Sequence, residues 1–161
     1  MINSVVTNPI DALQRRYLRA LDNRRIEDWV ACFSPEESSY VCTTFESRQA
    51  NFEIAMMRDT SFARIKDRAK MITEVWQKSF EDYATRHLIQ SIDVEQRSDG
   101  LFAATSNFLV MYVSPRRQSE VLGSGVYEDL IVVGEDGVAT FRSRTALLDG
   151  PTAPRYLVYP V

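Results

Sequence analysis

The chain has 161 residues, of which 25% are charged, and its formal net charge is −3 at pH 7. A chain of this length can bury a substantial core as one unit, so we expect residues 1–161 to form a single domain. The mild charge argues against nucleic acid as a partner, and no apolar run approaches the roughly 18 residues of a membrane span. Because no signal-peptide pattern opens the sequence, we expect a cytoplasmic protein that no membrane holds.

The first 35 residues carry the signals of two helices. Asn8 can cap a helix and Pro9 suits the first helical position, so a helix is predicted to begin here and to end near Leu21. From residue 26 to residue 33, apolar side chains recur at offsets of three, four and seven, which predicts a short second helix. Pro35 is expected to end that helix.

The middle of the chain predicts one strand and one long helix. Residues 38–45 are rich in β-branched and aromatic side chains and are typical of a strand. Residues 46–59 are irregular, with a short strand at 54–57 as one option. Residues 60–78 place apolar side chains three and four positions apart, which predicts a helix whose apolar stripe covers the concave face of a sheet.

Four further strands are predicted in the second half, at 87–96, 101–113, 120–133 and 138–148. Their connections contain turn-forming residues and are too short for parallel crossovers, so neighbouring strands are expected to be antiparallel. A sheet with one apolar face needs helices to cover that face.

Alternation along the last of these strands puts Arg142 and Arg144 on one face and Phe141 on the other. Two arginines placed in this way can clamp a carboxylate. They can also line a solvated or subunit-facing side of the sheet, which is the commoner role.

Together these elements predict an α+β fold. A strongly curved antiparallel sheet, made of the four-strand C-terminal meander plus the N-terminal strand, is expected to be covered by about three helices and to form a cone with a pocket inside. Such a cone suits enzymes and inert binding modules alike. The proline-rich tail carries apolar residues that we expect to be tied down in an assembly: Tyr156, Leu157, Val158 and Tyr159.

The most informative count for chemistry is the single histidine, His87. Non-haem iron sites of the facial-triad type need two histidines, and a Rieske cluster needs two histidines and two cysteines. Cys32 and Cys42 do not have zinc-finger spacing and are expected to be a reduced, buried pair. Any metal or redox chemistry is therefore assigned to a partner.

Without a metal, His87 has two possible roles. It can act as a general acid or base paired with Asp67, Asp93 or Asp129 inside the pocket. It can also be a buried histidine that makes a structural hydrogen bond. The second role extends to a structural or interface polar network, whose expected members are Asp67, Arg68, Arg86, His87, Arg142 and Arg144.

Several short motifs occur in a characteristic order along the chain. They are Asp28-Trp29 with Phe33, Asp67-Arg68, Arg86-His87, Tyr127-Glu128-Asp129, Arg142-Ser143-Arg144 and Tyr159-Pro160-Val161. In this order the chain resembles the small (β) subunit of aromatic-ring-hydroxylating Rieske non-haem iron oxygenases, which has the nuclear-transport-factor-2-like (NTF2-like) cone fold. Within that family it looks most similar to subunits of oxygenases that act on aromatic carboxylates such as salicylate, anthranilate or terephthalate.

The resemblance implies a division of labour between two subunits. It implies a structural β subunit of the terminal oxygenase component, with no catalytic residue and no cofactor in this chain. The large (α) subunit would hold the 2Fe–2S Rieske cluster and the mononuclear Fe(II), with NAD(P)H supplying electrons through a separate reductase. It also implies an α3β3 assembly with β–β trimer contacts. The alternatives are a stand-alone cone-fold lyase or isomerase that uses His87 with Asp67, and a small-ligand binding module.

Overall fold

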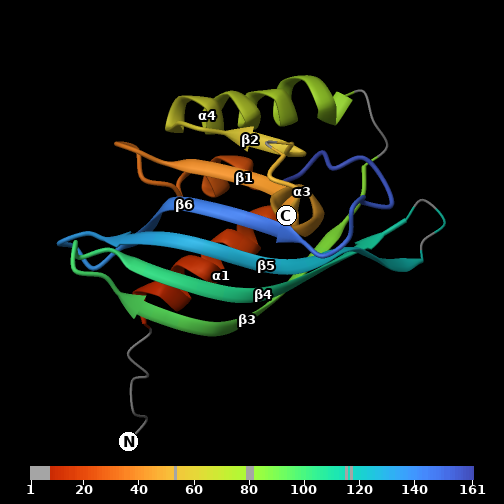
Figure 1. Ribbon diagram of the computed structural model, residues 1–161. Helices are drawn as coiled ribbons and strands as arrows, with labels where there is room; N and C mark the ends of the chain where they lie inside the picture. Colours follow the sequence, from red (N-terminus) through yellow and green to blue (C-terminus); the bar gives the residue numbers. More distant parts are fainter. Residues whose placement is uncertain (1–7, 53, 79–81, 115, 117) are drawn as a thin grey trace, which may run out of the picture.

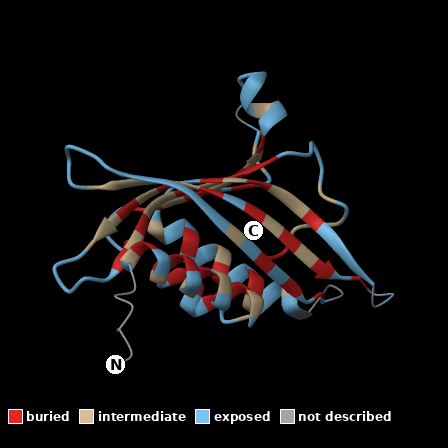
Figure 2. Ribbon diagram, turned by 90° about the horizontal axis from the view of Figure 1, so that it is seen from below, coloured by how far each residue is buried: buried red, intermediate tan, exposed pale blue. Residues whose placement is uncertain are grey.

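The computed structural model describes residues 8–52, 54–78, 82–114, 116 and 118–161. A single six-stranded sheet has the order β2-β1-β6-β5-β4-β3, with α1, α2 and α4 on one side of it and the short, exposed helix α3 on the other (Figures 1 and 2). The helices are α1 (Pro9–Asp22), α2 (Ile26–Val30), α3 (Phe45–Gln49) and α4 (Phe62–Lys70), the last continuing into a π-helical turn (Met71–Val75) and a 3₁₀ turn (Trp76–Lys78). The strands are β1 (Ser39–Thr44), β2 (Met57–Asp59), β3 (Thr85–Gln96), β4 (Phe102–Val113), β5 (Ser119–Val133) and β6 (Ala139–Leu148).

Helix α1 forms as the sequence predicts. The Asn8 side chain accepts a hydrogen bond from the backbone N–H of Ile10, and Pro9 occupies the first turn. The buried face of the helix includes Leu13, Tyr17 and Leu21. This face lies against the sheet, so α1 forms one wall of the interior (Figure 1).

The helix predicted over 60–78 is regular only as far as Lys70. Beyond it the backbone follows π-helical and 3₁₀ geometry. The Thr73 hydroxyl donates to the carbonyl oxygen of Ala69 at 3.0 Å, an interaction that competes with the regular α-helical bond of that carbonyl. Helix α4 packs on α2 and on the β2–β1 end of the sheet, so it covers only that end of the buried face.

The four-strand meander is confirmed, with strand ends within two residues of those predicted. Gly100 and Gly137 have positive φ angles of 84° and 76°, and each lies in a tight turn between neighbouring strands. The pairs β3–β4, β4–β5 and β5–β6 are all antiparallel. One register shift interrupts each pair, which adds local bends to the sheet.

The N-terminal strand does not follow the antiparallel expectation. Strand β1 runs parallel to β6, so the sheet as a whole is mixed. The long segment between β1 and β6 contains α4 and four further strands, so it can return the chain in the same direction. Residues 54–57 do not form the optional strand. The short edge strand β2 instead begins at Met57 and pairs antiparallel with β1.

The predicted alternation of side chains along β6 is wrong at one point, because the strand contains a register shift. Leu130 pairs with Ser143 and Ile131 with Phe141, so Arg142 is an extra residue in the strand. Phe141 and Arg144 consequently both belong to the buried face, although strict alternation separates them. Arg144 is completely buried, while Arg142 reaches the surface.

Aromatic rings form the centre of the core between α1, α2 and the sheet. Tyr17, Trp29, Phe33 and Phe141 contact one another mostly edge to face, with centroid separations of 5.2–6.4 Å. Figure 2 shows the buried residues concentrated between the helical layer and the sheet. Aromatic side chains therefore occupy the centre of the interior.

The tail returns into this core, and its residues do not share one environment. Val158, Tyr159 and Val161 are buried, whereas Tyr156 is 92% exposed. The backbone N–H groups of Val158 and Tyr159 donate to the Tyr83 hydroxyl at 3.2 and 3.4 Å. The tail is thus tied down by contacts within this chain, and its expected role in an assembly stays a prediction.

Candidate functional site

A buried ion pair between neighbouring strands lies at the centre of the cone. Arg144 on β6 is directly opposite Asp129 on β5, and both side chains have no exposed surface. Arg144 Nε and Nη2 donate to the two carboxylate oxygens of Asp129 at 2.8 and 2.7 Å, which is a bidentate pair. Gln14 on α1 completes the cluster by donating to Asp129 at 2.9 Å and accepting from Arg144 Nη2.

Three aromatic rings enclose the Arg144 guanidinium. Its central carbon lies 4.2 Å from the ring centroid of Tyr17 and 4.0 Å from those of Tyr127 and Phe141. Burial disfavours a charge on Arg144, but the Asp129 carboxylate overcomes that effect and raises the arginine pKa above its ordinary value. Arg144 therefore keeps its charge inside the core.

Surrounding hydroxyl groups remain neutral at physiological pH. Burial raises the pKa of Tyr17 to about 12, while the charge of Arg144 and the side chains of Trp29 and Tyr40 oppose that rise. Burial likewise raises the pKa of Tyr40 and of Tyr127 well above the ordinary value. All three hydroxyls keep their protons, and those of Tyr17 and Tyr40 donate to the Val161 oxygen.

A second polar pair joins the end of α1 to the start of β3. His87 Nδ1 lies 2.6 Å from Asp22 Oδ1, and the backbone N–H of His87 donates to the same carboxylate. The Thr85 hydroxyl donates to Asp22 as well. Burial favours the neutral form of Asp22, but the hydrogen bonds and charge of His87 prevail and lower the aspartate pKa. Asp22 holds one ring nitrogen of His87 in place.

The structure separates the remaining residues of the predicted network. Asp67 is exposed on α4, and Arg68 pairs with Asp59 of β2, with one bond of 3.1 Å. His87 contacts Asp22, so none of its three expected partners fills that role. Arg142 pairs with Glu37 at the surface, apart from the buried Arg144. The predicted residues thus form several separate pairs, because their partners come from segments that the sequence analysis did not connect.

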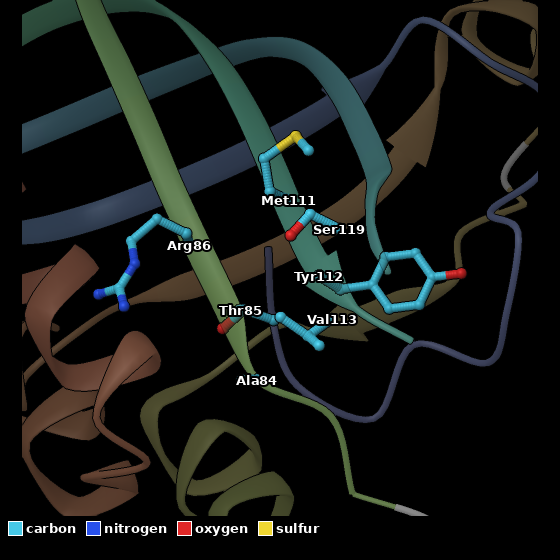
Figure 3. Close-up of a pocket in the computed structure, with 7 residues that line it drawn as sticks. All are labelled: Ala84, Thr85, Arg86, Met111, Tyr112, Val113 and Ser119. Atoms are coloured by element: carbon cyan, nitrogen blue, oxygen red, sulfur yellow. The ribbon is translucent and has the colours of Figure 1, made fainter. Parts of the chain in front are cut away.

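Arg86 lines a surface pocket near the start of β3. The pocket has a volume of about 400 Å³, and the close-up in Figure 3 shows its walls coming from β3, β4 and β5. Its lining residues are Ala84, Thr85, Arg86, Met111, Tyr112, Val113 and Ser119. Among the described residues that line the pocket there is one arginine and no carboxylate, so these residues supply no acid–base pair.

Neither cysteine has the features of a reactive or metal-binding thiol. Cys32 and Cys42 are free and buried. Burial raises the pKa of Cys32, and it raises that of Cys42 to about 12, so both thiols are protonated at neutral pH. Within the described ranges, no three His, Cys, Asp or Glu side chains are grouped so that they can hold a metal ion. In the same ranges no helix is long and apolar enough to cross a membrane.

Sequence reasoning missed Asp22, Gln14 and Asp59. Asp22 is the last residue of α1. A carboxylate at the end of a helix is more often exposed to solvent than hydrogen-bonded to a buried histidine. Asp59 is the last residue of the irregular segment 46–59, in which the optional strand was expected at 54–57. Gln14 was the easiest of the three to find from the sequence, because it lies between Leu13 and Tyr17 on the buried face of a predicted helix.

The mixed sheet, the helical layer and the filled interior define an NTF2-like α+β cone. The family model described as ring hydroxylating beta subunit matches residues 16–154, so the chain belongs to the ring-hydroxylating β-subunit family. It is therefore a subunit of an enzyme complex.

Relatives with established names agree with this membership. The small subunit of anthranilate 1,2-dioxygenase from Burkholderia cepacia is 24% identical over 149 residues, which cover 92% of this chain and 90% of that protein. The beta 2 subunit of the terminal oxygenase component of terephthalate 1,2-dioxygenase from a Comamonas species is 21% identical over 161 residues, all of both chains. The crystal structure of the benzoate 1,2-dioxygenase β subunit from Burkholderia mallei has a TM-score of 0.71 at 17% identity, covering 87% of this chain and 88% of that one.

Proposed function

We propose that this chain is a structural β subunit in the terminal oxygenase component of a dioxygenase that acts on an aromatic carboxylate in aromatic-compound catabolism. The observation that carries the proposal is the family match over residues 16–154. The substrate class rests on the relatives, whose names specify anthranilate and terephthalate, both aromatic carboxylates.

The proposal places the redox chemistry in a large α subunit. That partner would hold the 2Fe–2S Rieske cluster and the mononuclear Fe(II), and NAD(P)H would supply electrons through a separate reductase in the cytoplasm. The single histidine of this chain supports the division, since each iron site needs two. The proposed assembly is α3β3 with contacts between β subunits.

Two exposed regions are suitable for such contacts. On the face of the sheet away from α1, Leu88 and Val121 are each 50% exposed, near the pocket lined by Arg86. At the tail, Tyr156 presents almost its entire side chain to solvent. Exposed aromatic and aliphatic residues beside an arginine are typical of interface composition.

Co-expression of this chain with a large oxygenase subunit from the same organism tests the proposal. We expect an iron-bearing complex with equal numbers of both chains, measured by light scattering and metal analysis. We expect the chain purified alone to bind less than one tenth of an equivalent of iron or zinc. Failure of the two chains to copurify, or a stoichiometric transition metal in the isolated chain, would contradict the assignment.

A second candidate, proton transfer by this chain alone, rests on His87. Its Nε2 is buried and has no hydrogen-bond partner among the described residues, while Asp22 holds Nδ1. This is the arrangement of a general base with an orienting carboxylate. Turnover by the isolated chain that disappears in His87→Ala, while the melting temperature stays unchanged, would favour this candidate over the structural role.

A further inference from the structure

The main chain of Val161 enters the polar centre of the cone. Val161 is 1% exposed, and its carbonyl oxygen accepts hydrogen bonds from the Tyr17 hydroxyl at 2.8 Å and from the Tyr40 hydroxyl at 3.1 Å. The Val161 N–H donates to the Tyr40 oxygen at 3.1 Å. A backbone group from the tail is thus bound deep in the core by side chains of α1 and β1.

The same region holds more donors than the tail satisfies. Arg144 Nη1 and the Tyr127 hydroxyl are buried and have no hydrogen-bond partner among the described residues. Both side chains are completely inaccessible to solvent. Unsatisfied buried donors are uncommon in folded proteins and are costly, so their clustering calls for an explanation. The hydrogen bonds that Tyr17 and Tyr40 donate to Val161 involve one of its oxygens.

We propose that the interior of the cone is a binding site for the acceptor oxygen of a small apolar molecule, and that Pro160 and Val161 occupy this site as an internal ligand. This inference goes beyond the structural role proposed above and does not depend on the large subunit. The occupant seen in the structure, a carbonyl oxygen attached to a valine, shows the type of ligand that fits.

The chemistry of the walls defines the ligand class. Asp129 neutralises Arg144, so the site offers hydrogen-bond donors without an excess positive charge. The remaining walls are aromatic, including Phe33 and Phe141. A small acid or amide with a short apolar body therefore matches the site, with its oxygen toward Tyr17 and Tyr40.

The attachment of the tail explains why the site is closed in the intact chain. Tyr83 accepts hydrogen bonds from two tail amides, and the Tyr159 hydroxyl donates to Asp82 at 3.0 Å. The Arg24 guanidinium lies 3.8 Å from the centroid of the Tyr159 ring. These contacts hold Val161 at its site, and a tethered group competes at an effective concentration on the order of millimolar.

The test compares the full chain with a variant that lacks Pro160 and Val161. The anchors at Tyr83 and Asp82 remain in this variant, so the rest of the tail keeps its place. We expect benzoate and benzamide, each at up to 10 mM, to raise the melting temperature of the truncated chain. Ligand at ten times its Kd shifts the folding equilibrium about elevenfold. The full chain is expected to show no such shift, and toluene, which has no acceptor oxygen, serves as the control.

A substitution links the effect to the unsatisfied donors. In the truncated chain, Tyr127→Phe is expected to weaken the binding of the responding probe about two- to tenfold, the usual range for one hydrogen bond. If the truncated chain retains its circular dichroism spectrum and responds to neither benzoate nor benzamide more than to toluene, the proposal is overturned. An equal response of the full chain also overturns it.

If the truncated variant does not fold, hydrogen exchange of the full chain tests whether Tyr17 and Tyr40 bind Val161. With Tyr17→Phe and Tyr40→Phe combined, Val161 loses both donors, and we expect its amide to exchange at least about tenfold faster than in wild type. Tyr156→Ser, a change at an exposed position of the same tail, should leave that rate unchanged. Unaltered protection of Val161 in the double variant contradicts the internal-ligand model, whatever the result of copurification with a large subunit.

Discussion

Replacing Arg144 by methionine tests the buried ion pair at the centre of the cone. The substitution removes two charge-assisted hydrogen bonds to Asp129 and one bond to Gln14. Asp129 stays buried, with the Gln14 amide at 2.9 Å as its remaining side-chain partner. An uncompensated charge in such a place is the main source of the expected loss.

The magnitude follows from the complete burial of both partners. Breaking a buried pair by removing one member typically costs about 3–5 kcal/mol. The substitution also removes the cation–π contacts at 4.0–4.2 Å. Their loss is already included in this cost of breaking the buried pair. A domain of this kind has about 5–15 kcal/mol of total stability, so Arg144→Met is expected to remove a large fraction of it.

The double variant Arg144→Met/Asp129→Leu separates the charge from the shape. Replacing both ions by apolar groups of similar volume is often neutral, and it can stabilise a protein by about 1–4 kcal/mol. We therefore expect the double variant to be clearly more stable than Arg144→Met alone. Urea unfolding, followed by tryptophan fluorescence at pH 7, measures the difference between them.

The matched control is Arg142→Met on the same strand. Arg142 pairs with Glu37, and these side chains are 32% and 72% exposed, so the change is expected to cost at most about 1 kcal/mol. A loss below about 1 kcal/mol for Arg144→Met would refute the reasoning. So would a double variant that is as unstable as the single one, because the unpaired charge would then not be the cause.

Two other changes test the second polar pair and the exposed end of the tail. Asp22→Asn is expected to cost about 1–3 kcal/mol at pH 7. Because the folded-state pKa of Asp22 lies below its ordinary value of 3.8, this difference from wild type should persist above about pH 4 and fade as pH drops through the lowered pKa. Urea unfolding at pH 7, 4 and 3 checks it, and a constant difference would disagree. Tyr156→Ser is expected to weaken assembly with the large subunit while shifting the melting temperature of the isolated chain by less than about 2 °C. Unchanged sedimentation of the complex would exclude Tyr156 from the interface.

The sequence was most informative where structure depends on local periodicity. The meander alternates with a period of two and has glycine turns at Gly100 and Gly137, so its strands could be placed within two residues. Asn8 and Pro9 mark the start of α1 by a mechanism that needs no tertiary contact. Family membership also emerged at this level, since it depends on the order of short motifs.

The partners of charged residues were not predictable in the same way. Arg144 was expected to share a face with Arg142, but one extra residue in β6 places Arg144 in the core. A bulge of this kind leaves little trace in the amino-acid pattern, because Phe141, Arg142 and Ser143 all fit a regular strand. The pairing of His87 with Asp22 joins residues 65 positions apart, and it depends on where α1 ends over the sheet.

The side chains inside the cone bear on the role of the subunit. A cone-fold enzyme needs an accessible cavity with a titratable group facing the substrate. Here Arg144 is neutralised by Asp129, the neighbouring tyrosines are protonated, and Val161 occupies the donors closest to the centre. Such an interior stabilises the fold and leaves the outer face of the sheet to make contacts. A chain with this arrangement is suited to supporting catalysis in a partner, and its own cone becomes available to a ligand only when the tail leaves.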